Sequence, residues 1–380
     1  MRIKVRGIVA GILLFFLCGF GVPASAQGLS EDYAEYFESS GANELFGMAP
    51  EETQDLLEES GIASLDSEEL LALDAGSLWD ALLGELADRL AQPVKILVLT
   101  LGMVLIASMM GIMQSTTGEG TQSVFSVVVV LGVSGIIVSP LVQVIQDITA
   151  MISQIGEFIT GFVPVYAGVV AASGKPLSAF AYQGVLVTVI QVISFLTTNI
   201  LIPLICLYLA LSVSSAATHK IKVGGIANAI RSAVVWCLGL FLTVFVSLLT
   251  IKGFVAGAAD SVTFRTGKFL VGSLVPIVGN AVSDAMTVVQ GSLGVIRSSV
   301  GAFGILVIVL TFLPAVINLF FLNIALKISQ AASDSLGTSE VSGLLGSTGF
   351  VLSLLLAVLI CFAVMLVIAI SLMLMMTNGS

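Results

Sequence analysis

Charged residues are scarce in this chain of 380 residues, and their scarcity excludes a soluble globular protein. Only 10% of the residues are Asp, Glu, Lys or Arg, whereas 57% are hydrophobic and the mean hydropathy is +1.11. Soluble domains typically carry about 25% charged residues. Apolar runs of about 20 residues recur along the chain, and one such run spans a bilayer core of about 30 Å as a helix. The composition therefore predicts an all-α polytopic membrane protein.

The residue types that catalytic and metal sites use most are also few. The single histidine, His219, has no carboxylate near it in sequence, and Cys206, Cys237 and Cys361 each stand alone in an apolar segment. No Gly-x-x-x-x-Gly-Lys-Ser/Thr phosphate loop is present. We therefore expect no catalytic, cofactor-binding or metal-binding residues and no enzyme activity. Any ATP-driven work would have to come from a partner.

The first 26 residues have the pattern of a cleavable signal peptide. Arg2, Lys4 and Arg6 precede an apolar stretch from Gly7 to Val22, and Ala24-Ser25-Ala26 follows as a cleavage site. A retained membrane anchor is the alternative. Cleavage would place the mature N-terminus outside the cytoplasm.

Basic residues are nearly absent from residues 27–92, which hold 17 of the 24 acidic residues and only Arg89 among basic ones. Leucines recur there at helical spacing, and Pro50 followed by Glu51 and Glu52 is typical of a helix start. The pattern predicts an acidic extracytoplasmic segment of two or three short amphipathic helices. It is either a solvated cap or a docking surface for a partner, and its charge argues against nucleic-acid binding.

Residues 93–380 form the predicted transmembrane domain, with about six to eight crossings. Clear apolar segments lie near 93–113, 124–146, 182–212, 232–252, 301–328 and 346–376. Two weaker segments, 148–172 and 268–295, contain Gly, Pro and a charge. Such segments are expected to be broken helices or re-entrant hairpins.

An internal repeat of about 111 residues relates the two weaker segments. Gly156-Glu-Phe-Ile-Thr-Gly161, followed by Val163-Pro164, matches Gly267-Lys-Phe-Leu-Val-Gly272, followed by Val275-Pro276. The repeat halves cover about 124–231 and 232–345. Full crossing of each weak segment would give inverted copies of three spans, whereas re-entry would give parallel copies of two. The densest basic cluster, His219-Lys220-Ile-Lys222, slightly favours re-entry, but other basic residues oppose it and the topology stays open.

The repeated motif supplies the candidate functional residues, because repeat interfaces are where many transporters place their pathway. Glu157 in the first copy corresponds to Lys268 in the second. The two charges either pair or line a pore, or each lies at the membrane interface and reaches the headgroups. The candidate repeat-interface or pore-lining residues are Gly156, Glu157, Gly161, Pro164, Gly267, Lys268, Gly272 and Pro276.

The signal peptide, the acidic helical segment and the duplicated Gly-x-Phe, Val-Pro and Gln-Gly motifs resemble the stage III sporulation protein AE family of endospore-forming bacteria. The resemblance implies a permease-like multipass subunit of the channel complex that connects mother cell and forespore, located in the mother-cell-derived membrane. It also implies partners: a secretion-type ATPase and ring proteins of the intermembrane space. A homo-oligomer is compatible with that role.

A self-contained secondary transporter or exporter, with its site at the repeat interface, is the alternative function. Glu157, Lys268 and the broken helices would then form a substrate and ion site. A purely structural scaffold is a third interpretation.

Overall fold

The computed structural model describes residues 44–62, 75–114, 119–217, 224–274 and 279–378, and within these ranges every regular element is a helix. Two short helices precede six long helical rods, one of which is divided by a π-helical turn. The elements are α3 (Leu45–Met48), α4 (Glu51–Glu59), α6 (Ala75–Gln114), α7 (Glu119–Ala172), α8 (Pro176–Leu196), η2 (Thr197–Leu201), α9 (Ile202–Ala217), α10 (Gly224–Leu274), α11 (Gly279–Ser335) and α12 (Ser339–Asn378).

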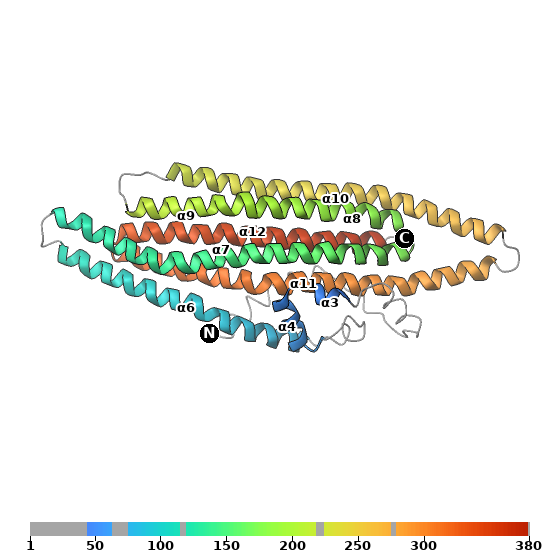
Figure 1. Ribbon diagram of the computed structural model, residues 1–380, viewed down its shortest axis with the longest axis horizontal. Coiled ribbons are helices and arrows are strands. Elements are labelled where there is room, and N and C mark those ends of the chain that lie inside the picture. Colours follow the sequence, from blue (N-terminus) through green and yellow to red (C-terminus); the bar gives the residue numbers. More distant parts are fainter. Residues whose placement is uncertain (1–43, 63–74, 115–118, 218–223, 275–278, 379–380) are drawn as a thin grey trace.

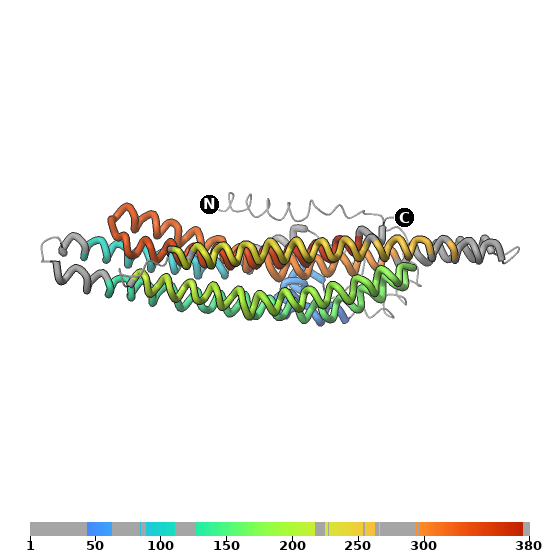
Figure 2. The backbone as a smooth tube through the Cα atoms, turned by 90° about the horizontal axis from the view of Figure 1, so that it is seen from above, coloured from blue at the N-terminus to red at the C-terminus, as the bar shows by residue number. Residues whose placement is uncertain are grey.

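The long helices lie side by side along one axis, as Figure 1 shows. From above, α7, α8 and α9 form one layer, and α10, α11 and α12 form the other (Figure 2). Helix α11 packs along α12 and α6, while α8 packs along α7 and α10. Six helical segments of the described chain are long and apolar enough to cross a membrane, so the predicted polytopic all-α class is confirmed.

Tight turns reverse the chain between neighbouring helices. Gly174 connects α7 to α8 with a φ of 92°, and Gly337 connects α11 to α12 with a φ of 74°. Only glycine adopts these left-handed conformations without strain. At the second turn the Thr338 N–H donates to the Ser333 carbonyl, which satisfies an acceptor at the end of α11.

The expected break in segment 148–172 is wrong, because these residues belong to the single helix α7. Pro140 and Pro164 both lie inside this helix, and Asp147, which separates the two apolar runs in the sequence, is exposed and does not interrupt it. A broken backbone in apolar surroundings leaves unpaired N–H and C=O groups that cost several kcal/mol each, so continuity is favoured. The second weak segment, 268–295, instead contains the junction between α10 and α11.

The two predicted repeat copies run in the same direction. Helix α7 is antiparallel to α8 and α9, α10 is antiparallel to them in turn, and α11 returns beside α12 (Figure 1). Each copy is therefore a hairpin of two long helical rods. The copies are parallel because residues 124–146 and 148–172 belong to one helix, which leaves two rods in each copy. Re-entry of the weak segment is not the reason.

A π-helical turn joins α8 to α9 just before Pro203. Proline has no N–H to donate, and a local π turn is one way to accommodate that loss. The side chains compensate: Asn199 Nδ2 donates to the Phe195 carbonyl at 2.9 Å, and Thr198 Oγ1 donates to the Ser194 carbonyl at 2.9 Å. Pro314, the repeat counterpart of Pro203, lies inside α11.

Candidate functional site

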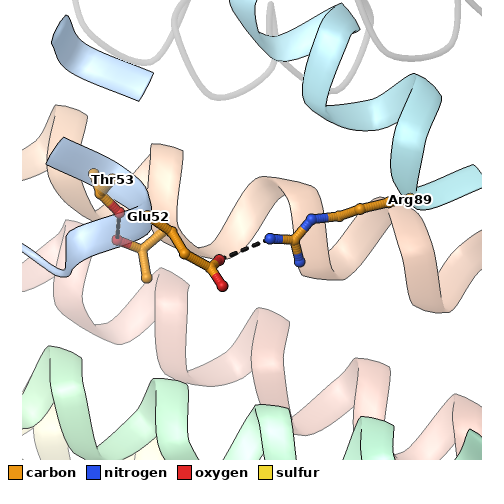
Figure 3. A network of polar contacts seen from close by, with 4 residues as sticks. Glu52, Thr53 and Arg89 are labelled. Carbon is orange, nitrogen blue, oxygen red and sulfur yellow. Dashed lines mark hydrogen bonds and ion pairs between the residues drawn. The ribbon is translucent and has the colours of Figure 1, made fainter. Parts of the chain in front are cut away.

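The acidic segment docks on the bundle through its apolar face. Helix α4 begins at Glu51 after Pro50, as the sequence predicts, and buries Leu56 and Leu57. Between α4 and α11, the hydroxyls of Thr53 and Thr311 are hydrogen-bonded at 2.8 Å (Figure 3). Helix α4 is therefore held against the middle of α11.

An ion pair also connects α4 to α6. Arg89 Nη2 lies 2.7 Å from Glu52 Oε2 (Figure 3), and Asp147 of α7 interacts electrostatically with both side chains. The other exposed edge of α4 consists of Glu51, Asp55, Glu58 and Glu59. Glu52 thus lies near Asp147 of α7, and the other four carboxylates of α4 are exposed. Helix α6 runs without interruption through residues 92 and 93, so the change in composition there is not a break in structure.

The first copy of the repeated motif lies in the interior of α7. Gly156 is buried, and a Cβ there would lie 3.6 Å from Ser194 Oγ, so α8 approaches closely at this point. Gly161 faces α3, where a Cβ would lie 2.7 Å from Met48 Sδ. Glu157 and Pro164 are exposed. A side chain would fit at Gly156 in ordinary contact with Ser194, one at Gly161 would displace Met48, and Glu157 faces outward.

The second copy lies at the end of α10. Gly267, Lys268 and Gly272 precede the last residue, Leu274, and Pro276 lies outside the described residues. Helix α10 does not pack along α7, because α8 lies between them. Asp260 of α10 is level with Ser178, so Lys268 lies about 12 Å beyond the α7–α8 turn and Glu157 about 22 Å before it, at 1.5 Å rise per residue. The backbone thus does not bring the two charged positions together.

Glu157 belongs to a longer exposed stripe, which we call the α7 polar face. Its residues share one side of the helix at helical spacing, and each is exposed: Ser139, Gln143, Gln146, Asp147, Ser153, Gln154, Glu157 and Thr160. No large hydrophobic side chain is exposed between residues 143 and 172. At the edge toward α8, Gln191 Nε2 donates to Thr160 Oγ1 at 2.8 Å. One side of a strongly apolar helix is therefore hydrophilic.

A buried polar cluster occupies the α7–α8 turn, where the two repeat hairpins meet. Asp260 of α10 is 2% exposed, and its carboxylate accepts the N–H groups of Leu177 at 3.0 Å and Ser178 at 2.7 Å. These are orphan donors at the start of α8, where the helix dipole also favours a negative charge. Arg297 of α11 is 6% exposed, and its Nη1 donates to Ser173 Oγ at 3.4 Å.

Lys175 lies in the same turn, between two helices that could cross a membrane. Partial burial lowers the pKa of its ammonium group, the neighbouring Arg297 lowers it further, and Asp260 opposes the shift. The cluster therefore gathers two cationic side chains around one carboxylate. Such an arrangement can hold the hairpins together or present positive charge to an anionic group.

Tyr166 and Gly301 pack tightly beside this cluster. The tyrosine is 1% exposed, and a Cβ at position 301 would lie 2.7 Å from its hydroxyl oxygen and 2.8 Å from Leu374 Cδ2. One turn further along α11, a Cβ at Gly304 would collide with the ring of Phe162. The absence of side chains at these glycines lets α7, α11 and α12 approach one another.

The sequence motifs predicted neither the α7 polar face nor the buried cluster around Asp260. A signal for the α7 polar face is present in the sequence, because Gln143, Gln146, Ser153, Glu157 and Thr160 recur every three or four residues and longer multiples of that spacing. The Asp260 cluster has no such signal, since its members are 82 to 124 residues apart. In the described ranges, no three His, Cys, Asp or Glu side chains are grouped as a metal site would require.

Fold and site together define a polytopic helical membrane protein with one hydrophilic side of α7 and a polar cluster between two helical hairpins. Residues 60–377 match the model of the stage III sporulation protein AE family. The chain belongs to this family, and the suspected relationship is confirmed. Family membership places the protein in sporulation.

The chain is similar to the stage III sporulation protein AE of Bacillus subtilis (strain 168). The two are 30% identical over 230 residues, which cover 60% of this chain and 56% of that protein. The match thus spans little more than half the length of the relative. No solved structure matches the chain.

Proposed function

We propose that the protein is a permease-like multipass subunit of a multiprotein transport or secretion channel complex that is required for endospore formation and connects mother cell and forespore. The observation that carries the proposal is the α7 polar face. A charged side chain facing lipid at the centre of a membrane helix costs about 2.5–3.5 kcal/mol on insertion scales. A hydrophilic side of this length therefore favours contact with water or with protein.

The position of the complex follows from the family resemblance. The protein would lie in the mother-cell-derived membrane around the forespore, with its mature N-terminus and the acidic segment in the intermembrane space. Its partners would be a secretion-type ATPase and ring proteins of that space. The exposed carboxylates of α4, including Glu58 and Glu59, suit contact with basic surfaces on such partners.

Replacement of the native gene in a spore-forming host tests this role. Deletion should block sporulation after engulfment, and a tagged wild-type copy should restore heat-resistant spores, form a ring of fluorescence around the forespore and co-purify with an ATPase and ring proteins. Glu58→Lys combined with Glu59→Lys should weaken the co-purification, whereas reversal at the distant Glu340 serves as the matched control. Normal spore formation without the gene would overturn the proposal.

The alternative, a self-contained secondary transporter, is favoured by the buried cluster of Asp260, Lys175 and Arg297 between the repeat copies. Membrane folds with repeats commonly bind substrates at the repeat interface. Purified protein in liposomes distinguishes the two. Ion-driven uptake by the chain alone, abolished by Asp260→Asn, would support the transporter and contradict the channel-subunit role.

A further inference from the structure

Helix α10 lies at the edge of the bundle and turns a long apolar side outward (Figure 1). In its apolar span, Asn228–Val262, 22% is buried, whereas 61% of the span of α12 is buried. Large apolar side chains are exposed along one side of α10 at steps of about one helical turn: Val235, Trp236, Leu240, Val244, Leu248 and Ile251. A continuous apolar surface of this kind marks contact with a membrane or with protein.

A cationic residue bounds this apolar side at each end. Arg231 and Lys252 are both exposed, and the sequence between them holds no charged residue. The two positions are 21 residues apart on one continuous helix, which corresponds to about 32 Å at 1.5 Å per residue. The hydrocarbon core of a bilayer is about 30 Å thick. The uncharged window therefore matches that core, and the long side chains at its edges can reach the headgroups.

The Arg231 end of the window has a further feature of a membrane interface. Trp236 is 68% exposed and lies five residues from Arg231, or about 8 Å along the helix. Tryptophan is enriched where membrane meets water, because its ring is apolar and its N–H is polar. The Arg231 guanidinium carbon lies 5.4 Å from the centre of the Phe350 ring of α12, which holds this charge at the edge of the window.

A second helix carries an exposed cation at the same level. Asn323 Nδ2 of α11 donates to the carbonyl of Gly349, the neighbour of Phe350, at 3.3 Å. Lys327 is exposed and lies one turn further along α11, or about 6 Å. Two helices therefore place cationic side chains at the same edge of the bundle, on either side of α12.

The exposed threonine of the window makes its hydrogen bond within the helix. Thr243 Oγ1 donates to the Gly239 carbonyl at 2.8 Å. A hydroxyl group paired in this way requires no water. The exposed side of α10 is thus compatible with hydrocarbon at this position, where unpaired polar groups are strongly disfavoured.

The opposite edge of the bundle is not suited to lipid at the same depth. Val244 precedes Asp260 by 16 residues, so it lies about 24 Å from the α7–α8 turn. Thr311 follows Arg297, which contacts the same turn, by 14 residues, or about 21 Å. Helix α4 docks on Thr311 at the far edge of the bundle from α10 and exposes carboxylates there (Figure 1). Lipid contact at this depth is therefore expected on the α10 side.

We propose that the outward side of α10 between Arg231 and Lys252 is a lipid-contact surface, which lies against phospholipid acyl chains across the hydrocarbon core. Trp236 then lies near one headgroup region, and Val244 lies deeper in the core. The inference goes beyond the proposed channel role and does not depend on it.

Tryptophan fluorescence tests the surface in the full-length protein, because the chain has only two tryptophans, Trp79 and Trp236. Trp79→Phe leaves Trp236 as the single probe. Val244→Trp and Phe245→Trp are each made in a chain in which both native tryptophans are replaced by phenylalanine. Val244 is 46% exposed and Phe245 is 0% exposed, so these neighbours share one depth and differ in the side they face. Each protein is reconstituted in phosphatidylcholine vesicles whose acyl chains carry bromine near the headgroup or near the chain end.

Bromine quenches tryptophan on contact, so the two neighbouring positions should respond differently. Val244→Trp should lose most of its fluorescence in brominated vesicles, and Phe245→Trp should keep most of it. Trp236 should be quenched more by bromine near the headgroup than by bromine near the chain end. Restoration of spores by each variant establishes that it folds, and Leu249→Trp, at a site that is also 0% exposed, is the control if Phe245→Trp does not restore them.

The possible results separate this inference from the channel role. Equal quenching at positions 244 and 245, or weak quenching at both, would overturn the lipid-contact surface, the second result because protein then covers α10. Stronger quenching of Trp236 by bromine near the chain end would overturn its place beside the headgroups. None of these results affects the channel role, which normal spore formation after gene deletion would contradict.

Discussion

Thr53 and Thr311 are hydrogen-bonded through their hydroxyl groups at 2.8 Å, although 258 residues separate them in sequence. Thr311 also donates to the Val307 carbonyl at 2.7 Å. Its hydroxyl oxygen therefore accepts the hydrogen bond that the Thr53 hydroxyl donates. Thr53 is 1% exposed. This contact joins α4 to the middle of helix α11.

Loss of this contact should loosen α4 from the bundle. Thr53→Val keeps the shape of the side chain but removes its hydroxyl, and Thr311→Val does the same from the other side. A double-mutant cycle should give a coupling energy of about 1 kcal/mol, because a typical hydrogen bond contributes that much. Limited proteolysis between α4 and α6 provides the measurement. Additive effects would show that the two hydroxyls act independently.

Gly304→Ala should destabilise the packing of α7 on α11. The added methyl group would collide with the ring of Phe162, which is 0% exposed and has no room to move. Overpacking of this kind costs about 1–3 kcal/mol. Gly294→Ala on the same helix is the matched control, because a Cβ there meets nothing within 4 Å. Apparent melting in detergent should fall for Gly304→Ala alone, and equal melting of the two variants would contradict the close approach.

Asp260 should contribute strongly to the stability of the folded protein, although it lies near the end of an apolar stretch. Asp260→Ala removes the acceptor of two N–H groups and the negative charge beside Lys175, for a loss of roughly 2–3 kcal/mol. Asp260→Asn keeps one acceptor oxygen, so its stability should lie between those of the wild type and Asp260→Ala. Thermal unfolding in detergent measures the order. An alanine variant as stable as wild type would show that the cap contributes nothing.

The lowered pKa of Lys175 predicts a dependence of stability on pH in the alkaline range. The folded state binds the Lys175 proton less well than the unfolded state, whose pKa is 10.5. Below the folded pKa the buried charge therefore opposes folding, and this penalty disappears as the pH rises toward 10.5. Lys175→Met lacks the penalty. The difference in melting temperature between variant and wild type should shrink from pH 8 to pH 10.5, and a constant difference would contradict the shift.

Local pattern accounts for much of what could be predicted about the fold. The helix start at Pro50 and Glu51 was predicted correctly, because first-turn carboxylates and a rigid proline act within one turn of helix. The apolar segments were located for the same reason. The predicted break at 148–172 is wrong because Gly156, Glu157 and Pro164 suggest a break only when they are considered apart from the helices that pack around them. Ser194 packs against Gly156, and Glu157 faces outward, so the helix continues.

The sequence by itself determined the class of this protein, since an apolar chain of helix-forming length has to satisfy its backbone inside its own helices wherever it meets lipid. It also predicts a duplication, through the matched motifs at Gly156 and Gly267. Only the tertiary structure decided that the copies run parallel, that Asp260 caps the start of α8 and that α4 lies beside Asp147. These features depend on which helix faces bury each other, a choice made by packing over the whole bundle and by no local stretch of residues.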